Sequence, residues 1–291
     1  MTEAADPRYR DLDLWTDATA LSAMWEAQMA AVAALGPALP AMAAAVGALA
    51  DRLARGGRLV YAGAGTSIRI AVQDGTELGP TFDWPEARTL YLIAGGEAAL
   101  RVAVEGAEDD TADAEAQVAA AGIGPADAVI GIAASGRTPF TVAALRAARA
   151  AGALTLGLAG AADAPLLVAA DHPICLATGP EVVAGSTRMK AGTAQKAALN
   201  LISTQAMVRL GRVHAGLMVD MRPANAKLRI RARGMVMELA GIDADGAEAA
   251  LAATRGRIKP AVLVARGLSL YDAQAALAAA GDNLRHALDQ L

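Results

Sequence analysis

Short apolar runs recur along this chain, and four of them pass directly into a turn that contains glycine. They read RLVYAGAGTS (58–67), TLYLIAGG (89–96), AVIGIAASGRT (128–138) and ALTLGLAG (153–160), and HPICLA (172–177) is a fifth run without such a turn. Segments with helical patterning separate them, for example PFTVAALRAARAAG at 139–152. Strands that alternate with helices at this spacing predict an α/β fold with a doubly wound, mainly parallel, five-stranded sheet.

The remainder of the chain is predicted to be helical. Residues 29–50 are uncharged and long enough for a membrane span, but Gly36, Pro37 and Pro40 interrupt them, so we expect two packed helices joined by a turn. The N-terminus has acids and no apolar core of a signal peptide. We expect a helical segment at 1–56 that packs on the core, a main domain at 57–239 and a small helical bundle at 240–291.

Composition and charge narrow the classes of function. The chain has 26 basic and 30 acidic residues and a net charge of −4, which lacks the basic excess of a nucleic-acid-binding protein. Its single cysteine, Cys175, lies in a run that reads as a buried strand, so neither a disulfide nor a catalytic thiol is expected. We therefore expect a soluble cytoplasmic protein without nucleic-acid or membrane partners.

Two of the predicted strands end in turns with the same types of residue. Each offers glycine for close backbone approach, hydroxyl groups, and the free N–H groups of a following helix, which together form a cradle for a phosphate or another anion. The alternative is an ordinary helix cap, in which Ser or Thr satisfies only backbone donors. Ligands bind beyond the carboxyl ends of the strands in such sheets. The residues are Gly65, Thr66 and Ser67 after the first run and Ser135, Gly136, Arg137 and Thr138 after the third.

A third polar cluster opens a long predicted helix at 187–212. Thr187, Arg188 and Lys190 crowd its start, where cations are unfavourable unless an acid of the protein or an anionic ligand offsets them. Both explanations stay open. Asn225 and Lys227 add polar groups on a later helix. GAGTSIR is not a dinucleotide fingerprint and GSTRMKAG is not a P-loop, so no nucleotide site is expected.

The stretch VEGAEDD (104–110) brings together Glu105, Glu108, Asp109 and Asp110. Acids favour the first turn of a helix. The residues alone therefore favour a solvated helix start over a proton carrier.

Seven motifs in their order give this chain a family resemblance. GAGTS, LIAGG, VEGAEDD, GIAASGRTP, GSTRMKAGTAQK, GLMVD and NAKL resemble the N-acetylmuramic acid 6-phosphate etherases, which contain a sugar-isomerase-type (SIS) domain, and less closely the glucokinase regulatory protein. The resemblance implies a cytoplasmic carbon–oxygen lyase of cell-wall recycling. It would cleave the D-lactyl ether of N-acetylmuramic acid 6-phosphate, a phosphorylated amino sugar, to N-acetylglucosamine 6-phosphate and D-lactate. The resemblance implies that no metal or organic cofactor is needed. It also implies a homodimer in which the neighbouring subunit completes the site.

The same resemblance implies catalytic roles for Glu77 and Glu108. The open-chain aldehyde acidifies the proton at C2, Glu108 removes it as the base, and Glu77 protonates the departing lactyl oxygen at C3 before water adds there. Asp109 and Asp110 would cap a helix or be exposed to solvent. The implied binding residues are Gly65, Thr66, Ser67, Glu105, Ser135, Gly136, Arg137, Thr138, Thr187, Arg188, Asn225 and Lys227.

Two departures from the family pattern bear on the substrate. Ile68 replaces the usual glycine after GTS, which would reshape the first phosphate loop or a dimer contact. Gly79-Pro80 replaces two prolines and would loosen the backbone that holds Glu77. Two rival functions stay open: a non-catalytic sugar-phosphate sensor, and an aldose–ketose isomerase that needs a base at C2 but releases no lactate.

Overall fold

The computed structural model describes residues 4–291, which form two compact units. The first contains the residues up to Gly75 and Ala87–Ser203, and the second contains Thr76–Glu86 and Thr204–Leu291. The division passes through two helices, α3 (Gly65–Phe82) and α7 (Lys190–Arg209). The three-part division at 56/57 and 239/240 stays a prediction.

The sheet of the first unit confirms the predicted fold class. All five strands are parallel, in the order β2-β1-β3-β4-β5. β1 and β3 are buried along their whole length, as expected for strands covered on both faces. Cys175 ends the edge strand β5 as a half-buried free thiol. The strands are β1 (Leu59–Gly63), β2 (Thr89–Ile93), β3 (Ala128–Ile132), β4 (Leu154–Ala159) and β5 (His172–Cys175).

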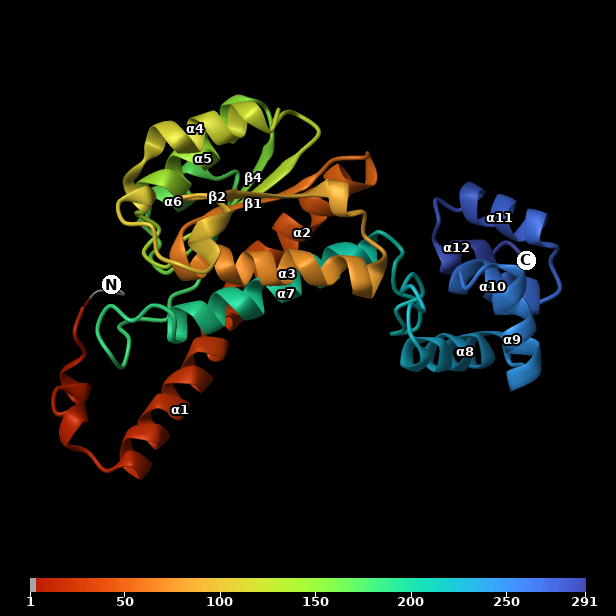
Figure 1. The fold of residues 1–291 in the computed structure, drawn as a ribbon, viewed down its shortest axis with the longest axis horizontal. Coiled ribbons are helices and arrows are strands. Elements are labelled where there is room, and N and C mark those ends of the chain that lie inside the picture. Colours follow the sequence, from red (N-terminus) through yellow and green to blue (C-terminus); the bar gives the residue numbers. More distant parts are fainter. Residues whose placement is uncertain (1–3) are drawn as a thin grey trace. The chain divides into compact units, whose positions relative to one another are not determined.

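Helices cover both faces of this sheet (Figure 1). α4, α5 and α6 lie on one face, where Phe140 and Leu145 of α5 are fully buried in the main core with Val129 of β3. α2 packs on the other face, against β3, β4 and β5. The helices not yet given bounds are α1 (Asp17–Ala33), α2 (Leu39–Ala54), α4 (Thr111–Ala120), α5 (Pro139–Ala150) and α6 (Pro165–Ala169).

The apolar N-terminal stretch forms two helices, as predicted. A short 3₁₀ turn at Gly36–Ala38 separates α1 from α2. By length and composition alone Asp17–Ala54 qualifies as a membrane span, which is weak evidence because core helices pass the same test. α2 buries one face in the core, whereas α1 buries only small residues and exposes Leu21, Trp25 and Met29 at a spacing of four. These three side chains form an apolar stripe along α1.

A buried carboxylate joins β1, α3 and α7. Asp74 of α3 accepts hydrogen bonds from the Tyr61 hydroxyl at 2.7 Å, the Asn200 amide at 2.6 Å and the Ser203 hydroxyl at 3.0 Å. Burial, reinforced by the Asp74 carboxylate, holds the pKa of Tyr61 well above its usual value. The carboxylate has a donor on each of its oxygens, so it is satisfied although no cation among residues 4–291 pairs with it.

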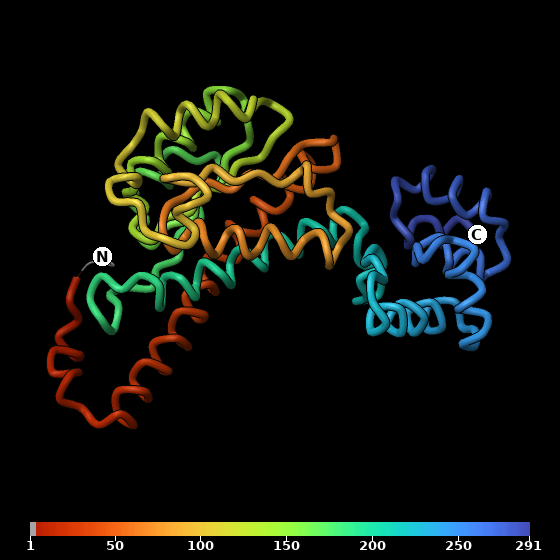
Figure 2. The backbone as a smooth tube through the Cα atoms, viewed as in Figure 1, coloured from red at the N-terminus to blue at the C-terminus, as the bar shows by residue number. Residues whose placement is uncertain are grey.

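The second unit is a helical bundle with its own core, in which Val236, Val262 and Leu263 are fully buried. Figure 2 traces residues 204–291 of this unit as the teal to blue end of the tube. Helices predicted after residue 240 are present. Their bounds are α8 (Ala226–Ala240), α9 (Ala244–Ala253), α10 (Ile258–Ala265), α11 (Leu270–Ala279) and α12 (Leu284–Leu288).

Candidate active site

A cavity of about 360 Å³ lies beyond the carboxyl ends of β1 and β3. These strands are neighbours, and the strand order runs outwards from them in opposite directions. Such a switch point is where ligands bind in open α/β sheets. The structure therefore brings the two predicted hydroxyl turns together. The predicted residues that line the cavity are Gly65, Thr66, Ser67, Glu108, Ser135, Arg137, Thr138 and Thr187.

The first turn opens α3 directly from β1. Gly65 has a φ of 53°, in the left-handed region that favours glycine. Thr66 is half-buried and Ser67 is buried. Ile68 is fully buried and is not among the lining residues. This departure from the family pattern therefore changes the packing beneath the turn rather than the lining of the cavity.

The second turn joins β3 to α5. The backbone N–H of Arg137 donates to the Ser135 hydroxyl at 3.2 Å. Thr138 is the N-cap of α5, yet its side chain makes no bond to the helix, so it does not act as an ordinary cap. Gly136 has a φ of 67°, and a Cβ there would lie 2.5 Å from that of Ala164, so this turn requires glycine.

Arg137 provides the cationic side chain of the second turn. Its guanidinium lies 3.2 Å from Asp163, and both side chains are largely exposed. An exposed pair of this kind contributes little to stability. The guanidinium therefore remains available to an anion in the cavity.

The predicted acids lie in different places. Glu108 is exposed and lines the cavity from the 3₁₀ helix at Ala107–Asp109, beside Asp109. Asp110 caps α4 by accepting the Asp113 N–H at 2.9 Å, as expected. Glu105 is exposed and does not line the cavity. Glu77 is exposed on the part of α3 that belongs to the second unit, and it is also outside the lining.

An acid that sequence reasoning missed binds the start of α7. Glu181 is fully buried, and its carboxylate accepts the backbone N–H groups of Lys190 and Ala191, each at 2.9 Å. The Lys190 ammonium donates to the Thr178 carbonyl at 2.9 Å. An acid of the protein thus supplies the negative charge at this helix start. Arg188 is exposed and has no ion-pair or hydrogen-bond partner within residues 4–291.

Asn225 and Lys227 lie in the second unit, at the start of α8. Asn225 is the N-cap, and its side-chain oxygen accepts the Leu228 N–H at 2.9 Å. Lys227 is exposed in the first turn. Neither residue lines the cavity of the first unit. Across the described part of the chain, no group of three or more His, Cys, Asp or Glu side chains is arranged to hold a metal ion.

Comparisons with known proteins agree with the resemblance. The model of the glucokinase regulatory protein N-terminal SIS domain matches residues 41–149, and the SIS domain model matches residues 110–204. N-acetylmuramic acid 6-phosphate etherases from Deinococcus radiodurans and Streptomyces avermitilis are 51% and 47% identical to this chain. The first alignment covers 99% of this chain and 95% of the relative, and the second covers 91% and 86%.

A solved structure supports the fold. The phosphoheptose isomerase from Francisella tularensis is similar with a TM-score of 0.51 at 21% identity, over 67% of this chain and 98% of that one. At this identity the likeness concerns the fold alone. The sequence relatives carry the family assignment: this chain belongs to the N-acetylmuramic acid 6-phosphate etherase family.

Proposed function

We propose that this protein is a cytoplasmic lyase that cleaves the D-lactyl ether of N-acetylmuramic acid 6-phosphate. The products are N-acetylglucosamine 6-phosphate and D-lactate, and the role is in cell-wall recycling. Membership of the etherase family supports the reaction. The observation that carries the proposal is the cavity between the β1 and β3 turns, where hydroxyls and a carboxylate face one space.

The phosphate of the substrate binds in the two turns. Thr66, Ser67, Ser135 and Thr138 contribute hydroxyl groups there. The starts of α3 and α5 contribute backbone N–H groups, which favour an anion because the helix dipole is positive at that end. Arg137 adds a positive charge next to the second turn.

Two glutamates move the protons. The sugar opens to its aldehyde, and Glu108 removes the acidified proton at C2. The C3–O bond then breaks as Glu77 protonates the departing lactyl oxygen, which leaves a double bond between C2 and C3. Water adds to C3 and the proton returns to C2. Each proton transfer by a positioned side chain contributes a factor of about 10²–10⁴ to the rate.

The working form that we propose is a homodimer whose neighbouring subunit supplies Glu77. Two observations support it. Glu77 is exposed and does not line the cavity that contains Glu108. The apolar stripe on α1 faces solvent in one chain, and such a surface is typical of protein contacts.

The second anionic end of the substrate, the lactyl carboxylate, needs its own cation. Arg188 is exposed beside Thr187, which lines the cavity, and no acid among residues 4–291 pairs with it. We assign the carboxylate to Arg188. A guanidinium suits this task because it binds a carboxylate through two parallel hydrogen bonds.

The test is release of D-lactate from N-acetylmuramic acid 6-phosphate by the purified protein, with Glu77→Gln and Glu108→Gln measured beside it. We expect release by the wild type and a fall in kcat of about 10²–10⁴-fold in each variant. Glu115→Gln, at an exposed position of α4 outside the cavity lining, is the matched control and should retain most of the kcat. Absence of lactate at saturating substrate would overturn the proposal and favour a sensor or an isomerase.

A further inference from the structure

A second polar cavity, of about 790 Å³, lies entirely within the second unit. Its volume falls within the range of small-molecule sites, about 300–1,000 Å³. The walls come from the segment after α7, the end of α3 and the turn that leads into α10. Five basic side chains and three carboxylates line it, namely Arg212, Arg222, Arg255, Arg257, Lys259, Asp83, Asp220 and Asp282.

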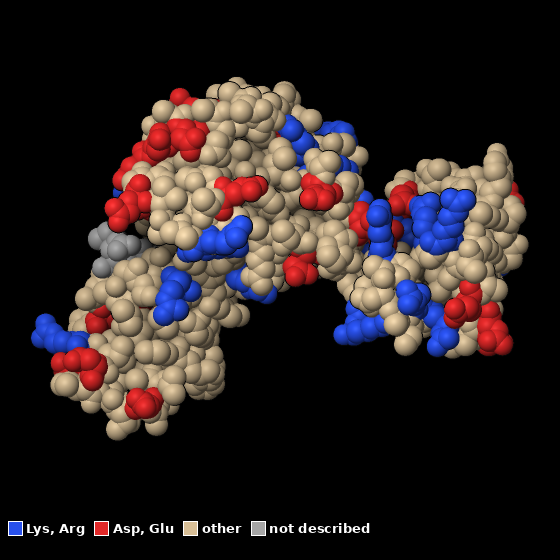
Figure 3. Space-filling view, viewed as in Figure 1, with Lys and Arg blue, Asp and Glu red and all other residues tan. Residues whose placement is uncertain are grey.

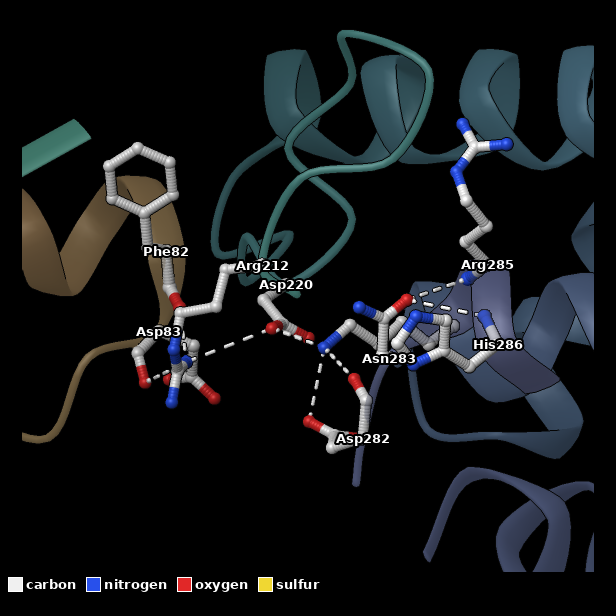
Figure 4. Close-up of polar contacts among 9 residues, drawn as sticks. Phe82, Asp83, Arg212, Asp220, Asp282, Asn283, Arg285 and His286 are labelled. Carbon is white, nitrogen blue, oxygen red and sulfur yellow. Dashed lines mark hydrogen bonds and ion pairs between the residues drawn. The ribbon is translucent and has the colours of Figure 1, made fainter. Parts of the chain in front are cut away.

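Each of the three carboxylates forms an ion pair with a basic side chain that lines the same cavity. The buried Lys259 ammonium lies 2.6 Å from Asp220 and 3.0 Å from Asp282, and it also donates to the Asp282 carbonyl at 2.7 Å. Asp83 pairs with Arg222. Arg212 donates to the Asp83 carbonyl at 3.2 Å and lies 3.8 Å from Asp220 (Figure 4). No carboxylate of the lining is left to neutralise a further cation.

Arg255 and Arg257 are the uncompensated charges. Both are exposed, and neither side chain has an ion-pair or hydrogen-bond partner anywhere in the described chain. Arginine is suited to bind phosphate because its planar fork presents two parallel N–H donors. Two such forks on one cavity wall match a ligand with two negative charges.

Hydrogen bonds hold the turn that contains these two arginines in place before any ligand binds. The Thr254 hydroxyl lies 3.0 Å from the Ala250 carbonyl and 2.9 Å from the Arg257 carbonyl, either of which can accept its proton, and the Gly256 N–H donates to the Leu251 carbonyl at 2.8 Å. Arg255 has a φ of 55°. A non-glycine residue in this left-handed region is strained, and such strain is concentrated at ligand sites.

The surroundings are positive although the whole chain has a net charge of −4. Residues 222–233, which include the first half of α8, contain five basic residues and no acidic one. Figure 3 shows basic side chains gathered on the second unit. Arg257 is also the N-cap of α10 and makes no side-chain bond to that helix, so the positive end of its dipole adds to the field.

We propose that this cavity is a second ligand site, which takes the phosphate group of a small phosphorylated metabolite on Arg255 and Arg257. The size of the cavity favours a sugar phosphate over inorganic phosphate, because a phosphate ion alone leaves most of the volume to water. The site is separate from the cavity between β1 and β3. Its existence does not depend on the lyase reaction.

Local hydrogen exchange in the intact protein tests this site. Glucose 6-phosphate and inorganic phosphate serve as probes, each against chloride at matched ionic strength. We expect slower exchange in residues 251–261 with glucose 6-phosphate at lower concentrations than with phosphate. Arg255→Gln with Arg257→Gln should weaken this protection by about a hundredfold, because each charge-assisted bond is worth about tenfold or more.

Arg285→Gln is the matched control, because Arg285 is an exposed arginine of the same unit outside the cavity lining. Figure 4 shows its guanidinium pointing away from Asp220 and Asp282. Protection should persist in this variant. Unchanged exchange in residues 251–261 of the wild type, or equal protection in the double arginine variant, would overturn the second site. Protection confined to the turns after β1 and β3 would also overturn the second site, but it would not contradict the proposed lyase reaction.

Discussion

Glu181 is the residue that organises the backbone next to the candidate active site. Its fully buried carboxylate receives two N–H groups of the first turn of α7, at Lys190 and Ala191. Those groups would otherwise lack partners at a helix start, and the negative charge complements the helix dipole. Thr187, which lines the cavity, lies just before this turn. The acid therefore fixes the chain from which Thr187 and Arg188 extend.

Glu181→Gln should lower the free energy of unfolding by about 1–3 kcal/mol, because one backbone N–H then faces an amide NH₂ instead of a carboxylate oxygen. Urea unfolding measures the change. Glu115→Gln, on an exposed position of α4, is the matched control and should shift the midpoint little. Equal midpoints for the two variants would show that Glu181 does not hold this helix start.

Local sequence predicted some of these residues and not others. The hydroxyls of Thr66, Ser67, Ser135 and Thr138 follow directly from strands, so their place at a strand end could be predicted. Glu181 lies nine residues before Lys190, across an irregular segment. The only signal for it was that basic residues at a helix start require an acid nearby.

Among the elements, the strands were the most predictable from the sequence. Their order in the sheet could not be predicted from it. The apolar runs predicted all five strands, but only the structure puts β1 beside β3 and so unites their turns. Helix α3 also runs through Pro80 to Phe82. Proline lacks an N–H and crowds the preceding turn, yet α3 continues through Pro80 without a break. The Gly79-Pro80 departure therefore leaves Glu77 on regular helix.

An ion pair ties the start of β1 to the start of β3. Arg58 donates to both oxygens of Asp127, at 2.8 and 2.7 Å, and Gly124 donates to the same carboxylate at 3.0 Å. Burial by itself raises the pKa of Asp127, but the bonds from Arg58 and Gly124 outweigh it and leave that pKa below its ordinary value. The folded protein thus binds this proton less readily than the unfolded chain.

This pair should give stability that is complete at neutral pH and is lost as the pH falls below about 4, the ordinary carboxyl pKa. Asp127→Asn should lower the free energy of unfolding at pH 7 by about 1–3 kcal/mol. It should also flatten the fall of stability below pH 4. Urea midpoints from pH 2 to 7 measure both effects. Asp289→Asn, at an exposed position, is the control. If the urea midpoint of Asp127→Asn fell with pH as steeply as that of the wild type, the stabilising role of the Arg58–Asp127 pair would be contradicted.

At the scale of the whole molecule, one of the two proposed catalytic glutamates is absent from the lining of the cavity. Glu108 lines the cavity and Glu77 does not. The apolar stripe of Leu21, Trp25 and Met29 on α1 faces solvent. The sequence patterns indicated neither fact, because α1 reads as a helix whether or not a partner covers it. Only the family resemblance implied a dimer, and the homodimer proposal accounts for both observations.

The measurement that tests this account most directly is complementation between two inactive variants. Glu77→Gln and Glu108→Gln chains are co-expressed with different tags, and D-lactate release is measured on the mixed dimers and on each variant alone. If each site takes Glu108 from one chain and Glu77 from its neighbour, a random mixture should regain about a quarter of the wild-type activity, since half of the dimers carry one intact site of two. A mixture no more active than either variant, beside an active wild type, would contradict the shared site.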